Sequence, residues 1–128
     1  MVEEVAPLKE EAQTPVPHAW RDTLGAIVDS FIRGDARIGQ DLENVEPISE
    51  DRSNACRDNI AAYGPVTLVQ LPEATWNTSV AMWQGDHWDC LVDLWTTEED
   101  RSDLILHVDV TEDPATAFRF HPYLVYVP

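Results

Sequence analysis

The stretch LVDLWTTEEDRSDLILHVDV, residues 91–110, decides the fold. Apolar and polar residues alternate on both sides of an acidic break, a pattern typical of two half-buried strands joined by a solvated turn. Trp95 lies in the first arm and His107 in the second. We therefore expect a β-hairpin here, with Asp89, Asp93, Asp103 and Asp109 on its outer face beside His107.

The same period of two recurs in both directions from this hairpin. Short turns separate the alternating segments, and consecutive strands with short turns predict an antiparallel meander. Pro122 cannot donate a backbone hydrogen bond, so it favours an edge position or a β-bulge in the last strand. The predicted strands are residues 66–71, 75–83, 88–96, 102–110 and 117–128.

Two helices are predicted before the strands. In residues 18–35, apolar side chains recur at helical spacing and Gly34 suits the C-terminal cap. In residues 49–64, Ser49 can cap the first turn and Gly64 ends the helix. The apolar positions of the first helix are Trp20, Leu24, Ile27, Val28 and Phe31.

Helices that precede a run of strands predict an α+β fold. We expect two N-terminal helices packed on one face of a curved antiparallel meander of four to five strands. Residues 1–17 are rich in Glu, Ala and Pro and are expected to form a flexible leader. Residues 18–128 then form a single domain.

The chain is strongly acidic, with 24 acids against 8 Lys and Arg and a net charge of −16. Residues 1–17 hold four glutamates and one lysine, so the predicted domain carries −13. Phosphate contacts need clustered Lys and Arg, so we expect neither nucleic acid nor an anionic membrane as a partner. No long apolar run or secretory signal is recognisable, which predicts a cytoplasmic protein. A basic protein partner, or solubility alone, would explain the charge.

No known catalytic arrangement is recognisable. Four histidines (His18, His87, His107 and His121) fall on separate predicted elements, and no nucleophile motif or phosphate-binding loop is present. Cys56 and Cys90 lie far apart and are expected to be reduced, buried thiols. The acids around His107 could suggest a metal site, but alternating acids are also typical of a solvated face. We expect no enzyme, no cofactor and no metal.

Four of the five tryptophans fall within residues 76–95. Alternation places Trp76 and Trp88 on one face of the sheet, and Trp83 and Trp95 on the opposite face beside the acids. A bent strand that turns both pairs inward is the alternative. Exposed aromatic side chains rimmed by charge are typical of a protein-binding surface.

Several short motifs resemble a family of small uncharacterised bacterial domains. The resemblance covers about half of the chain and implies no activity. Asp100 stands where a glycine is commoner in that pattern, which leaves the turn type open. The matching motifs are Tyr63-Gly64, Leu71-Pro72, Trp76, Val92 to Thr96, Glu98-Glu99 with Ser102 to Leu104, and Tyr126 to Pro128.

In type, small acidic bacterial domains without catalytic motifs also resemble immunity proteins, which bind and block a cognate toxin. The leading hypothesis is therefore an acidic protein-binding inhibitor of a basic toxin domain. The alternatives are a small α+β enzyme or ligand binder that uses the concave sheet face, with His107 or His87 as base, and an accessory domain whose charge only keeps it soluble. The predicted contact residues are the acids Asp86, Asp89, Asp93, Glu98, Glu99, Asp100 and Asp103, with Trp83 and Trp95 as anchors.

Overall fold

The computed structural model describes residues 4–128 and has an α+β fold. Its single antiparallel sheet has the order β1-β2-β3-β4-β5, so every strand pairs with its neighbour in sequence. The meander is therefore as predicted, although two of its strands differ from the prediction. The strands are β1 (Thr14–Pro15), β2 (Val80–Trp83), β3 (Trp88–Thr96), β4 (Asp100–Asp113) and β5 (Ala117–Tyr126).

The two predicted helices are present as α1 (His18–Arg33) and α2 (Glu50–Tyr63). The end of α1 is set by Gly34, which adopts a left-handed conformation at φ 78° and donates its N–H to the Phe31 carbonyl. The start of α2 is set by Ser49, whose Oγ accepts the Arg52 N–H at 3.1 Å. Both signals were recognisable in the sequence. Within residues 4–128, neither helix has the length and apolar character needed to cross a membrane.

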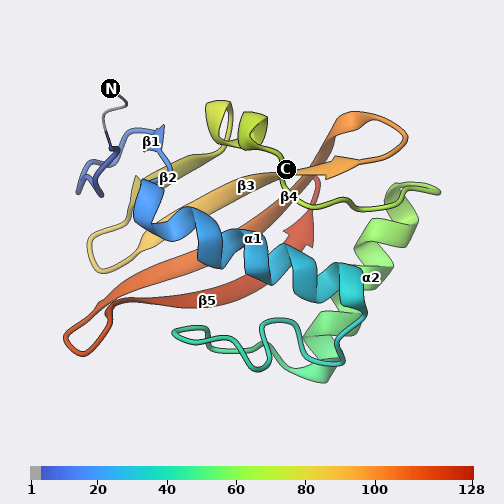
Figure 1. Ribbon diagram of the computed structural model, residues 1–128, viewed down its shortest axis with the longest axis horizontal. Helices are drawn as coiled ribbons and strands as arrows, with labels where there is room; N and C mark the ends of the chain where they lie inside the picture. The colour runs from blue at the N-terminus through green and yellow to red at the C-terminus, as the bar shows by residue number, and fades with distance from the viewer. Residues whose placement is uncertain (1–3) are drawn as a thin grey trace.

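The core lies between α1 and one face of the sheet, and α1 runs across the sheet in Figure 1. Trp20 of α1 is fully buried and packs edge-on against Trp88 of β3 and Phe118 of β5, at centroid distances of 5.2 and 5.4 Å. Such pairs add a little to the much larger stabilisation from burying apolar area. This contact fixes α1 on the sheet.

Helix α2 packs beside β5. The side-chain amide of Asn59 donates to the Val125 carbonyl at 2.8 Å, and Cys56 on the same helix is buried. Cys90, on β3, is also buried, and neither cysteine is bonded to another. The prediction of two buried, reduced thiols is therefore confirmed.

The predicted strand over residues 66–71 is wrong. This segment makes one isolated bridge, Leu68 to Thr96, and the Val69 N–H donates to the Trp95 carbonyl at 3.0 Å. Prolines bracket the segment at Pro65 and Pro72 and remove two backbone donors, which keeps the pairing short.

The predicted strand over residues 75–83 is only half right. Its first part forms the 3-10 helix η1 (Glu73–Asn77), and β2 begins at Val80. The Thr75 hydroxyl donates to the Asp93 carbonyl at 2.7 Å, and the Asp93 N–H donates to Ser79 Oγ at 2.9 Å. These side-chain bonds replace part of the backbone ladder, which alternation alone does not indicate.

Part of the expected flexible leader belongs to the sheet. Thr14 and Pro15 form β1, which pairs with β2, and Val16 is fully buried in the core. Further upstream, the Leu8 carbonyl accepts the Trp88 indole N–H at 3.0 Å. Residues 1–3 of the leader lie outside the described residues.

Short segments flank both edges of the β2–β5 ladder. On one side the two-residue β1 pairs with β2. On the other side, Phe120 of β5 exchanges backbone hydrogen bonds with Asn44 and Glu46, each at 2.8 Å. The ladder between β4 and β5 is shifted where Pro122 pairs with Val108, so Pro122 lies at a bulge in the last strand, as predicted.

Candidate functional site

The candidate site lies on the sheet face opposite α1. Along β3, Trp88, Cys90, Val92 and Leu94 are buried toward the helix, and the residues between them face the other way. Asp89 and Asp109 of β4 share this face, as predicted, and they lie directly opposite each other. Like charges in opposed positions destabilise a sheet, so the pair requires compensation nearby.

Two histidines supply this compensation. His107 on β4 places its Nε2 atom 2.9 Å from Asp109 Oδ1 and 3.5 Å from Asp89 Oδ1. His87, from the turn before β3, places its Nε2 atom 3.0 Å from Asp89 Oδ1 and 3.9 Å from Asp109 Oδ1. Each imidazole therefore lies near both carboxylates. We call His87, Asp89, His107 and Asp109 the His-Asp cluster.

The other ring nitrogen of each histidine, Nδ1, also has a hydrogen-bonding partner. His87 Nδ1 lies 2.6 Å from Asp86 Oδ1, and His107 Nδ1 lies 3.2 Å from the Tyr126 hydroxyl. Partial burial lowers the pKa of His87, but its hydrogen bonds to Asp86 and Asp89 outweigh this and raise the pKa above its usual value. The turn histidine is thus held in an anionic environment, which favours a proton or another cation.

The sequence contained a signal for this cluster that our prediction did not use. His87 and Asp89, like His107 and Asp109, are separated by one residue, as His-Trp-Asp and His-Val-Asp. Residues two apart on a strand face the same side, so two such pairs on neighbouring antiparallel strands can converge. Although His87 lies in a turn, its side chain is only 30% exposed.

The predicted acids do not form one compact patch. Asp86 lies in the turn between β2 and β3, and Asp89 lies at the start of β3. Glu98, Glu99 and Asp100 lie at the hairpin between β3 and β4, at the other end of β3 (Figure 1). Asp93 lies between the two groups on the outer face, and Asp103 is exposed near the hairpin.

These acids have no Lys or Arg partner in the part of the chain that the structure describes, although Asp86 and Asp89 contact histidines. The ion pairs made by Lys and Arg are Lys9–Glu112, Arg33–Asp35 and Arg119–Glu46, and none involves a predicted contact acid. Asp93 accepts a hydrogen bond from the Thr78 hydroxyl, and Glu98 accepts one from the Thr67 N–H at 2.6 Å. Their negative charge is therefore held in place and not neutralised.

One of the two predicted anchors is misplaced. Trp83 pairs directly with Trp88, so it faces the helix side with the core aromatics and not the outer face. The error follows from the shortened β2 and its register, which sequence alternation could not fix. Trp95 lies on the outer face opposite Arg101 and is half-buried; its Nε1 atom is buried, so its exposed part is apolar.

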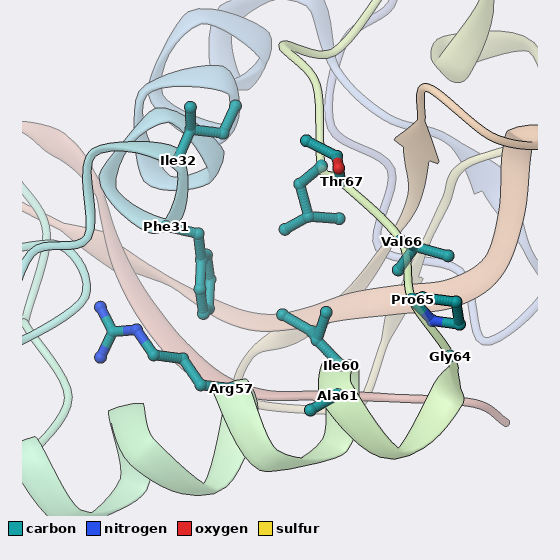
Figure 2. Close-up of a pocket in the computed structure, with 10 residues that line it drawn as sticks. Phe31, Ile32, Arg57, Ile60, Ala61, Gly64, Pro65, Val66 and Thr67 are labelled. Carbon is teal, nitrogen blue, oxygen red and sulfur yellow. The ribbon is translucent and has the colours of Figure 1, made fainter.

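A hollow of about 690 Å³ lies away from these residues, between the end of α1, α2 and residues 64–68. Figure 2 shows Phe31 and Ile60 near the centre of the view, with Arg57 on the left and Val66 on the right. The Arg57 guanidinium donates to the Asp35 carbonyl. The sequence did not indicate this hollow, because residues 66–71 were expected to form a paired strand.

The His-Asp cluster combines imidazole nitrogens and carboxylate oxygens, which are groups that can hold a cation or move a proton. Single ligand atoms of His87, Asp89 and Asp109 lie within 4.8 Å of one another. The cluster and the neighbouring acids therefore make the sheet face opposite α1 the best candidate for function. We call it the open face.

Comparison with known proteins gives one match. Neither the curated proteins nor the solved structures contain a significant match to the chain. A family model described as a domain of unknown function, DUF7668, matches residues 28–128, from the middle of α1 through the whole β2–β5 meander. The match covers most of the chain, and the protein therefore belongs to the DUF7668 family.

Proposed function

We propose that this protein is an acidic inhibitor that binds a basic partner protein in the cytoplasm, in the manner of an immunity protein that blocks its toxin. The observation that carries the proposal is the set of acids along the open face and its hairpin, which have no Lys or Arg partner among residues 4–128. A net charge of −16 makes a cationic surface the favoured partner.

The distribution of charge suggests how such a partner would bind. Acids at both ends of β3 create a negative potential along the length of the open face. Such a potential accelerates encounter with a basic surface more than it increases the affinity of the final complex. Trp95 would then contribute apolar contact area between the two acidic ends, and Trp83 would not take part directly because it faces the core aromatics.

A charge-matched comparison tests this proposal. The proposal expects a basic protein to be encoded beside this gene. That protein is used as the partner, and association rates are measured at low and moderate salt. The face variant is Asp93→Asn, Glu98→Gln, Glu99→Gln and Asp103→Asn. The control variant, with the same loss of charge elsewhere, is Glu11→Gln, Asp22→Asn, Glu43→Gln and Asp58→Asn.

The face variant should associate about tenfold more slowly at low salt, and the control variant should stay near the wild type. Trp95→Ala should mainly accelerate dissociation. Equal rates for the two charge variants would remove this face from the interface. If the wild-type protein neither binds the neighbouring basic protein nor relieves its toxicity in cells, the inhibitor proposal itself is wrong.

A further inference from the structure

The His-Asp cluster has a geometry that the protein-binding proposal does not use. We propose that His87, Asp89, His107 and Asp109 form a binding site for one divalent transition-metal ion of the zinc class. This inference is independent of the proposed function, because it requires no partner protein.

The first argument is the spacing of the donor atoms. Each histidine Nε2 lies near both aspartate Oδ1 atoms, and the four separations are 2.9, 3.0, 3.5 and 3.9 Å. Ligands at about 2.0–2.1 Å from zinc lie about 3.3 Å apart in a tetrahedral site and about 2.9 Å apart in a square-planar one. The ligand atoms of His87, Asp89 and Asp109 already lie within 4.8 Å of one another. His107 is near both aspartates but lies outside that group, so its side chain must rotate toward His87 to complete a four-ligand site.

The second argument is the orientation of the histidines. Histidines that bind metals usually have their other ring nitrogen fixed by a carboxylate or another hydrogen-bonding group. Here Asp86 holds His87 Nδ1 at 2.6 Å, and the Tyr126 hydroxyl lies 3.2 Å from His107 Nδ1. Both Nε2 atoms are thus directed to the carboxylates before any ion arrives, which lowers the entropic cost of binding.

The third argument is the rigidity and exposure of the frame. Asp89, His107 and Asp109 lie on two long, directly paired strands, and only His87 comes from a turn. The four side chains are between 17% and 37% exposed, so an ion can enter from solvent and keep a position open to water. An open position would also admit a side chain from another molecule.

The donor set indicates which ions fit. Imidazole nitrogens suit zinc, nickel and copper, whereas Ca²⁺ prefers six to eight oxygens and Mg²⁺ prefers an octahedral shell rich in water. A surface that attracts cations only through its negative charge would not make this distinction. Selectivity for Zn²⁺ and Ni²⁺ over Mg²⁺ and Ca²⁺ therefore separates a built site from general acidity.

The test uses the untagged full chain and titration calorimetry with ZnCl₂, NiCl₂, MgCl₂ and CaCl₂. We expect one Zn²⁺ per chain with a Kd on the order of 1 µM or below, and no comparable binding of Mg²⁺ or Ca²⁺. His87→Asn and His107→Asn should each weaken Zn²⁺ binding about tenfold or more. His18→Asn, which removes a histidine at the start of α1, is the matched control and should bind as the wild type does.

A measurement on the wild-type protein covers the case in which a variant fails to fold. In ¹⁵N-labelled protein, Zn²⁺ should shift the Nε2 resonances of His87 and His107 together and leave those of His18 in place. The proposal is overturned by an absence of Zn²⁺ binding, by equal binding of Mg²⁺ or Ca²⁺, by histidine variants that bind like the wild type, or by zinc-induced shifts at His18 alone.

Discussion

Trp83 of β2 lies directly opposite Trp88 of β3, with ring centroids 4.5 Å apart, and the Lys9 ammonium group lies 5.0 Å from the Trp83 ring. Because Trp88 also donates its indole N–H to the Leu8 carbonyl, this pair joins the N-terminal segment to the sheet. An aromatic pair that we had expected to be split between two faces is instead the link between chain start and core.

Trp88 and Trp95 lie on opposite faces of β3, so their replacement should lower the folding stability by very different amounts. Trp88 is 1% exposed, so Trp88→Ala should lower the free energy of unfolding by about 3–5 kcal/mol. Trp95 is half-buried on the outer face, so Trp95→Ala should cost roughly 1–2 kcal/mol. Urea denaturation measures both values. Equal costs would contradict the assignment of the two residues to different faces.

Replacing either of two glycines with alanine should change the stability of the fold, in opposite directions. Gly39 has φ +90°, and a Cβ atom there would lie 2.7 Å from Val45 Cγ1, so Gly39→Ala should destabilise the fold by about 1–3 kcal/mol. Gly25 lies inside α1 with free space around it, so Gly25→Ala should stabilise by about 0.5–1 kcal/mol. Thermal unfolding of the two variants should shift the midpoint in opposite directions.

Acid should weaken the junction after α1. Hydrogen bonds from Arg33 and Ser30 lower the pKa of Asp35 below its usual value. A carboxyl whose pKa is lower in the folded state contributes stability above its unfolded pKa and loses it as the pH falls through the folded pKa. Asp35→Asn should therefore make the free energy of unfolding depend less steeply on pH below about 4. An unchanged slope in denaturation between pH 5 and 2 would contradict the role of Asp35.

High pH should destabilise the fold through the buried thiol of Cys90. Complete burial raises the pKa of this thiol above its ordinary value of 9.0, so the folded state retains a proton that the unfolded state loses. The stability this provides is full below pH 9 and is lost as the pH rises further. Cys90→Ala should reduce this alkaline loss, although it lowers the stability at neutral pH.

Thiol labelling gives an independent check on Cys90. Because only the thiolate reacts, a disulfide reagent should modify the folded protein at least about a hundredfold more slowly than the unfolded protein. Rapid labelling of both thiols in the native protein would show that Cys56 and Cys90 are accessible.

The sequence predicted those parts of the fold that depend on local periodicity. The stripe from Trp20 to Phe31 and the caps at Gly34 and Ser49 predicted the helices, and alternation predicted β3 and most of β4. It failed where side chains or distant segments compete for backbone groups. Thr75 and Ser79 take bonds that a strand would have used, and nothing near Thr14 indicates that it pairs with Ala81.

The candidate site was predicted in part for the same reason. The shared face of Asp89 and Asp109 follows from strand alternation within one hairpin, which is a local property. The convergence of His87 with His107 depends on how a turn folds back on its strand, and the position of Trp83 depends on the register of β2. Neither is fixed by the residues immediately around it.

The segments that flank the β2–β5 ladder affect whether another chain can add a strand to the sheet. β2 is covered by Thr14 and Pro15, and β5 gives backbone groups to Asn44, Glu46, Asn59 and Arg52. An incoming strand would find the outer edge of β5 largely occupied, and on the other side it would meet only the two-residue β1, which contains Pro15. Extension of the sheet through backbone pairing is therefore disfavoured. Recognition by this molecule should consequently proceed through side chains, so peptide mimics that add a strand would make poor competitors.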